Sequence, residues 1–217
     1  MRKTSYVVTF FAVLISLAFT LFSAYLPDWL EETGPDLPYT KATIRYGLLE
    51  VCERQKVQIP GPDGSKIDYT RYECRPWPAR VTDKCETENK TLCVEWTSAG
   101  YFVELSIGFA VTALLAIVFG VSTHSRRRRI WRAVAGLVAV HAILQIVAFA
   151  LITDAYRKSR YAGFEHARPS TAYVLNMVDW LLSIFIVFGV VTTGISADAG
   201  HRWAAGNRAY QPIRGGE

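Results

Sequence analysis

Long apolar stretches alternate with polar connections along this chain. A bilayer core of about 30 Å requires roughly 20 apolar residues in a helix, and four stretches reach that length. They are residues 6–25, 99–122, 131–152 and 173–195. The pattern predicts an all-α membrane protein whose core is a bundle of four transmembrane helices, with the lipid bilayer as its main surrounding.

The connections between these stretches differ greatly in length. Residues 26–98 form a long polar loop, residues 153–172 a short one, and residues 196–217 a tail. The composition agrees with one polar loop added to an apolar bundle, because 51% of the residues are hydrophobic while the mean hydropathy is only +0.16. We therefore expect residues 1–217 to form a single tetraspan domain.

The basic residues predict the orientation of the chain. Arg126 to Arg129 separate the second and third stretches, and further basic residues flank the first and the fourth. Cytoplasmic flanks are enriched in lysine and arginine, so both termini are expected in the cytoplasm. The loops 26–98 and 153–172 are expected outside the cell, at the plasma membrane. This distribution also explains the net charge of +5 without nucleic acid. A cleaved signal peptide is the alternative for residues 6–25, although that stretch is long for one.

Two segments of the long loop alternate as β-strands do. These are Thr43–Cys52 and Ile67–Cys74, with the turn-forming sequence Pro60-Gly61-Pro62-Asp63-Gly64 between them. We expect two antiparallel strands joined by a long hairpin. They would form a small antiparallel sheet, which needs further strands or a crosslink for stability.

The long loop holds all four cysteines, which allow three pairings. Sequential pairing is favoured, because Cys52 and Cys74 end the two expected strands and Cys85 and Cys93 bracket a short loop. The first pair would then require a bulged or staggered hairpin. Zinc is the rival explanation, but the spacing is wide and the loop lacks histidine. Asn89 begins the sequence Asn-Lys-Thr, a glycosylation signal.

A family resemblance rests on the residues Trp29, Gly47, Leu48, Leu49, Cys52 and Cys74. A tryptophan after the first helix, then Gly-Leu-x, then two cysteines resembles the claudin signature. The superfamily includes claudins, peripheral myelin protein, calcium-channel gamma subunits and fungal plasma-membrane tetraspan proteins. The resemblance implies a left-handed four-helix bundle under a small sheet, to which the second outer loop adds a strand. Leu49 replaces the tryptophan of claudins, and a second cysteine pair is added, so a divergent member is expected, with the fungal type as one candidate.

Five polar residues interrupt the apolar stretches: Glu104, His141, Gln145, Asn176 and Asp179. Such residues are costly in a membrane and usually have a role. Hydrogen bonds between helices are the favoured explanation. A path for ions or protons and contact with a partner helix are the alternatives.

The sequence contains no recognisable catalytic constellation or glycine-rich phosphate loop. We therefore expect a non-enzymatic tetraspan without cofactor or metal, which organises or regulates neighbouring membrane proteins by lateral association. The partners' identity stays open, and self-association is one option. The alternatives are cell–cell adhesion or a paracellular barrier, and a small channel or transporter.

Overall fold

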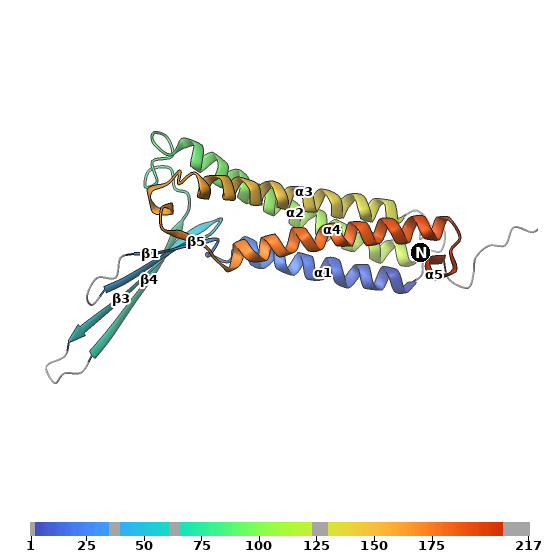
Figure 1. Cartoon of the computed structure of the whole chain (residues 1–217), viewed down its shortest axis with the longest axis horizontal. Helices are drawn as coiled ribbons and strands as arrows, with labels where there is room; N and C mark the ends of the chain where they lie inside the picture. The colour runs from blue at the N-terminus through green and yellow to red at the C-terminus, as the bar shows by residue number, and fades with distance from the viewer. Residues whose placement is uncertain (1–2, 35–39, 61–65, 123–129, 206–217) are drawn as a thin grey trace, which may run out of the picture. The chain divides into compact units, whose positions relative to one another are not determined.

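The computed structural model describes residues 3–34, 40–60, 66–122 and 130–205. Its four long helices are long and apolar enough to cross a membrane, which confirms the four predicted spans (Figure 1). Their bounds are α1 Lys3–Tyr25, α2 Lys90–Ser122, α3 Ile130–Arg157 and α4 Thr171–Asp198. A 3-10 turn, η2, covers Ala162–Phe164, and a short helix, α5, covers Arg202–Ala205. The arginine run at 126–129 lies outside the described residues.

Helix α2 begins at Lys90, well before the expected start of the span at residue 99. Hydropathy underestimates its length because the first turns pack against protein rather than lipid. Leu92 and Trp96 are fully buried in these turns, whereas Val94 is exposed.

Five antiparallel strands form one sheet, in the order β4-β3-β2-β1-β5. Their bounds are β1 Leu30–Thr33, β2 Thr40–Tyr46, β3 Glu50–Pro60, β4 Lys66–Pro76 and β5 Ala167–Pro169. Strand β5 comes from the short connection between α3 and α4 and pairs with β1. The strand that the family resemblance implied for this connection is therefore present.

The prediction of one strand over Thr43–Cys52 was wrong, because the structure breaks it at Gly47. The Gly47 amide donates to the carbonyl of Glu50 at 2.8 Å and closes a turn between β2 and β3. A Cβ atom at Gly47 would lie 2.6 Å from the Cα atom of Pro27, so only glycine permits this close approach.

The expected bulge or stagger of the hairpin was also wrong. Strand β3 continues past the cysteine to Pro60, so the hairpin is longer than the alternation suggested. Cys52 therefore faces Cys74 directly in the β3–β4 register, and their Cα atoms are 4.1 Å apart.

The chain packs as two compact units. The first comprises residues 1–18, 106–143 and 179–217 and takes a segment from each long helix. Its interior is an apolar cluster that includes Tyr6, Val13, Ile117 and Trp131. The Trp131 ring packs tightly on Gly194, where a Cβ atom would lie 2.4 Å from it.

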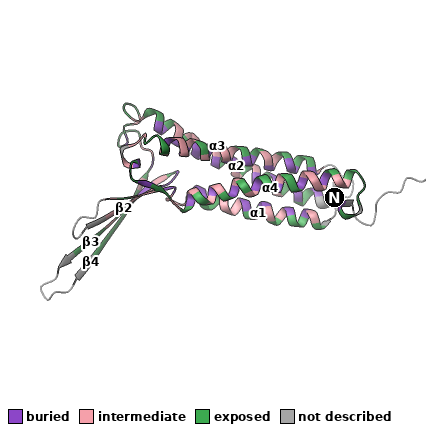
Figure 2. Ribbon diagram, viewed as in Figure 1, coloured by how far each residue is buried: buried purple, intermediate pink, exposed green. Residues whose placement is uncertain are grey.

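The second unit comprises residues 19–105 and 144–178. It holds the whole sheet and the helix segments next to it. A cluster of aromatic rings lies at its centre, with contacts among Tyr46, Trp77, Trp96, Tyr161 and Phe164. Figure 2 shows that the β3–β4 hairpin is largely exposed, while each long helix alternates between buried and exposed positions.

Candidate functional site

Trp29 of the signature completes the end of helix α1. The last helical hydrogen bond in this region joins the Leu26 amide to the Phe22 carbonyl at 2.9 Å. The next carbonyl, that of Ser23, would ordinarily accept from residue 27, but this residue is proline and has no N–H. The indole Nε1 of Trp29 donates to the Ser23 carbonyl instead, at 2.7 Å. The buried tryptophan thus satisfies a carbonyl that Pro27 leaves open.

The turn at Gly47 joins the sheet to α2. Its carbonyl accepts a hydrogen bond from the indole Nε1 of the buried Trp96, at 2.9 Å. Leu48 is buried beside it, whereas Leu49 is 44% exposed. The signature residues therefore meet around one junction of the second unit, with Leu49 on its surface.

Both predicted disulfides are present, Cys52–Cys74 and Cys85–Cys93. Glu50 lies with the first pair in a group of potential metal ligands. Because both sulfurs are committed to the disulfide, they are not available as thiolates. The pair therefore serves as a crosslink between β3 and β4.

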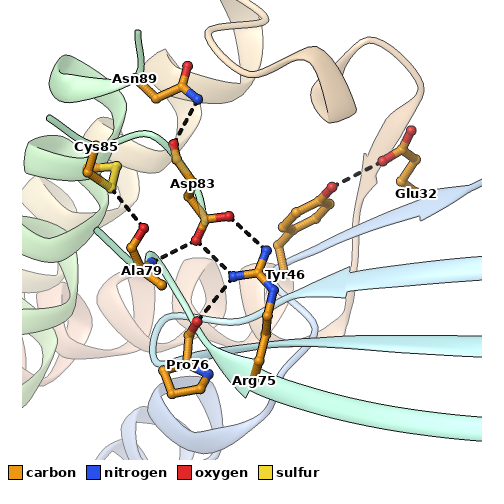
Figure 3. A network of polar contacts seen from close by, with 9 residues as sticks. Glu32, Tyr46, Arg75, Pro76, Ala79, Asp83, Cys85 and Asn89 are labelled. Carbon is orange, nitrogen blue, oxygen red and sulfur yellow. Dashed lines mark hydrogen bonds and ion pairs between the residues drawn. A yellow bond between two sulfur atoms is a disulfide. The ribbon is translucent and has the colours of Figure 1, made fainter. Parts of the chain in front are cut away.

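A charged network supports the segment that follows β4 (Figure 3). The Arg75 guanidinium binds both carboxylate oxygens of the buried Asp83, at 2.8 and 2.7 Å. The same carboxylate accepts the Ala79 amide at 2.7 Å. Asp83 raises the pKa of Arg75 through this contact. Such bidentate pairing fixes both partners in position.

Asn89, the candidate glycosylation site, lies next to the start of α2. Its side-chain Nδ2 donates to the Asp83 carbonyl at 2.9 Å (Figure 3). Its own carbonyl accepts the Cys93 amide at 2.9 Å, within the first turn of the helix. A glycan at Asn89 remains a prediction, and it would be joined at this same nitrogen.

His141 and Asp179 meet in the interior of the first unit. The His141 Nε2 atom lies 3.3 Å from a carboxylate oxygen of Asp179, and both side chains are buried. Ser16 on α1 donates to the other carboxylate oxygen at 2.5 Å, and Ser183 lies 3.0 Å from the Ser16 hydroxyl. The other imidazole nitrogen, Nδ1, lies 3.0 Å from the Ser106 carbonyl. Four helices thus contribute to one buried polar cluster.

Serine, histidine and aspartate also form hydrolytic triads, but their order here is different. A triad needs the serine and the carboxylate on opposite nitrogens of the imidazole. In this cluster Ser16 and Asp179 both contact Nε2, and the Ser16 hydroxyl donates its hydrogen bond to the Asp179 carboxylate. This arrangement is typical of buried polar side chains that form hydrogen bonds with one another and so join neighbouring helices.

The other predicted polar residues of the spans divide into two kinds. In the second unit, the Asn176 amide donates to the Gln145 side chain, and both residues are buried. Glu104 of α2 is exposed instead, and within the described ranges of the chain its carboxylate has no hydrogen bond or ion pair. Hydrogen bonding between helices therefore describes four of the five residues and not Glu104.

No family model matches this chain, and no curated protein matches it.

Sequence reasoning missed Ser16, Ser183 and the backbone carbonyl of Ser106. Isolated serines are common in membrane helices, where they also bond to their own helix, so their presence carries little information. Only Ser183 could have been found from the sequence. It stands four positions after Asp179, so the two side chains share one helix face and could be expected to interact.

Proposed function

We propose that this protein is a non-enzymatic tetraspan that organises neighbouring membrane proteins through lateral contact at helix α2. The observation that carries the proposal is the exposed Glu104. It is the one charged residue between Thr97 and Ser122 in the sequence. A carboxylate that faces lipid is costly, and a binding partner removes that cost.

The depth of Glu104 follows from its position on α2. Trp96 donates to the Gly47 carbonyl, next to the chain that leaves α1 at Pro27. The apolar stretch begins at about residue 99, one turn beyond Trp96, and the helix rises about 7–8 Å from there to position 104. We infer that the Glu104 carboxylate lies in the outer part of the apolar layer.

The surroundings of Glu104 form an open face on α2. Tyr101, three positions before Glu104, is 67% exposed, and Leu105, four positions after Tyr101, is 54% exposed, whereas Val103 is fully buried toward the unit's interior. We call Tyr101, Glu104 and Leu105 the α2 outer face. An apolar face with one acid matches a transmembrane helix that carries lysine, arginine or another hydrogen-bond donor at the same depth.

The topology and family belong to the same proposal. The arginine-rich connection supports cytoplasmic termini, and the disulfides support an oxidising exterior for the sheet. The strand order, the crosslinked β3–β4 hairpin and the buried Trp29 agree with a divergent member of the claudin superfamily at the plasma membrane. The mutually bonded interior cluster supports a structural rather than a catalytic role for the spans.

Photocrosslinking in the native membrane tests the α2 outer face. A photoreactive benzoylphenylalanine replaces Tyr101 in one variant and Val174 of α4, 46% exposed, in the matched control. We expect a discrete protein adduct from position 101, its loss when Glu104→Leu is added, and only lipid adducts from position 174.

A second measurement separates association from folding. Because Glu104 is exposed and has no hydrogen bond or ion pair among the described residues, Glu104→Leu should leave the thermal stability in detergent unchanged or raise it. Lipid adducts alone from position 101, or a protein adduct that persists with Glu104→Leu, would contradict the proposal. Loss of stability in Glu104→Leu would instead assign the carboxylate a structural role.

A further inference from the structure

One face of the sheet carries an open groove between its strands. Its lining residues are Arg45, Arg54, Thr70 and Tyr72, around a cavity of about 290 Å³. The register explains why these four gather. Arg54 faces Tyr72 across β3 and β4, and Lys56 faces Thr70 one pleat further along. Because side chains alternate across a strand, Arg54, Thr70 and Tyr72 share one face. Arg45 lies on the same face, because it pairs with Cys52, two positions before Arg54 on β3.

The two arginines of this groove are less fully paired with acidic side chains than the arginines of strand β4. Arg71, on the opposite face, is paired with Glu73 at 2.7 Å, and Arg75 is paired with Asp83. Arg45 is partly neutralised, since its Nε atom contacts Glu31 at 3.0 Å. Arg54 is exposed, and it makes no ion pair in the part of the chain that the structure describes.

Among the described side chains, the Arg54 guanidinium of this groove therefore has no paired acid. The directly adjacent position on this face, Lys56, adds a second exposed positive charge. A guanidinium prefers planar oxyanions, to which it donates two parallel hydrogen bonds. These charges favour an anionic ligand at the groove.

The neutral side chains narrow the class of ligand. The Tyr72 side chain is 56% exposed and combines a flat apolar ring with a hydroxyl group. Thr70 adds a second hydroxyl, which both donates and accepts hydrogen bonds. An aromatic ring, two hydroxyls and a cation together fit a sugar ring that bears an acidic group.

We propose that this groove binds an acidic polysaccharide, with Arg54 contacting its carboxylate or sulfate group and Tyr72 packing against a sugar ring. The binding requires only the sheet of the second unit. It is therefore independent of any lateral partner at the α2 outer face.

The test uses the purified full-length protein in detergent with defined probes. Heparin supplies sulfate groups, hyaluronan supplies carboxylates, dextran is the neutral polysaccharide and polyglutamate is the acidic peptide. We expect heparin or hyaluronan to bind, dextran not to bind and polyglutamate to bind more weakly. Binding should weaken at high salt, because the contacts are exposed to solvent.

Paired variants on the hairpin decide whether the groove is the site. Arg54→Gln should weaken polysaccharide binding about tenfold or more, since it removes charge-assisted hydrogen bonds. Arg71→Gln removes the same charge from the opposite face and should leave binding within about twofold. Tyr72→Ala should weaken binding, whereas Tyr72→Phe should retain most of it. Mapping of the Cys52–Cys74 disulfide verifies the fold of each variant.

Several results would overturn the proposal. Equal losses in Arg54→Gln and Arg71→Gln would show general charge attraction without a site. Polyglutamate binding as tightly as the polysaccharides would assign the groove to acidic peptides. Absence of binding by both heparin and hyaluronan would also reject it.

Discussion

Replacing Trp29 with phenylalanine should destabilise the protein chiefly through one hydrogen bond. The indole group is fully buried and donates to the Ser23 carbonyl at 2.7 Å, in place of the amide that Pro27 lacks. Leaving that carbonyl unsatisfied costs about 1–3 kcal/mol. The smaller ring also leaves a cavity beside Tyr173, which packs edge-on against the indole ring. We therefore expect Trp29→Phe to cost at least about 2 kcal/mol.

Thermal unfolding in detergent measures this cost. A loss of about 2 kcal/mol lowers the midpoint by about 4–8 °C in a protein of this size. Trp203→Phe is the matched control, because Trp203 is 57% exposed and surface changes usually stay within about 0.5 kcal/mol. Pro27→Ala in the Trp29→Phe background restores a backbone N–H and should recover part of the loss. An unchanged midpoint for Trp29→Phe would refute the capping role, and a fall without recovery by Pro27→Ala would assign the effect to packing alone.

Three further substitutions test other parts of the structure. Gly47→Ala should cost more than about 2 kcal/mol, because its Cβ would lie 2.6 Å from backbone at Pro27; a thermal midpoint equal to that of the natural protein would contradict this close approach. His141→Ala should cost about 1–3 kcal/mol, because it removes one of the polar groups that contact the buried Asp179 carboxylate, and the double variant with Asp179→Asn should be less destabilised than His141→Ala alone. Burial raises the pKa of Asp28 above its ordinary 3.8. Its contribution to stability is therefore greatest at acidic pH and falls as the pH rises through the raised pKa. Asp28→Asn should flatten this part of the profile of thermal midpoint against pH.

Hydropathy predicted the spans because the bilayer core requires a predominantly apolar composition along the whole length of a spanning segment. The same reasoning placed the second helix too late. Its first turns, around Trp96, pack against the aromatic cluster of the second unit and need no lipid-like composition. Packing between distant segments, rather than local hydropathy, determines that boundary.

The break at Gly47 could not be read from local alternation. The residues from Thr43 to Cys52 have strand-forming side chains, and the close approach of Gly47 to Pro27, distant in sequence, is visible only in the folded chain. The cysteine pairing was predictable, since strand ends and short spacing restrict it. The register was not, because the described side chains of the hairpin between Cys52 and Cys74 are mostly exposed, so no buried apolar face fixes it.

The polar residues of the spans show a similar limit. Glu104 and Asp179 are both single acids in apolar helices, yet one is exposed and the other is buried against His141. A transmembrane helix is apolar on all sides, so its composition does not distinguish the face toward lipid from the face toward neighbouring helices. Only the packing of the helices shows that Asp179 makes an interior contact and that Glu104 lies on an exposed face.

Association with a designed helix tests the central claim about the α2 outer face. The labelled protein is reconstituted into vesicles with leucine-rich transmembrane peptides that differ only in one residue at the depth of Glu104, lysine or leucine. Energy transfer reports their association. We predict about 3- to 30-fold tighter association with the lysine peptide, from a polar contact of about 0.6–2 kcal/mol, and loss of that preference in Glu104→Leu. Equal association with both peptides, or a preference that survives Glu104→Leu, would contradict lateral recognition through Glu104.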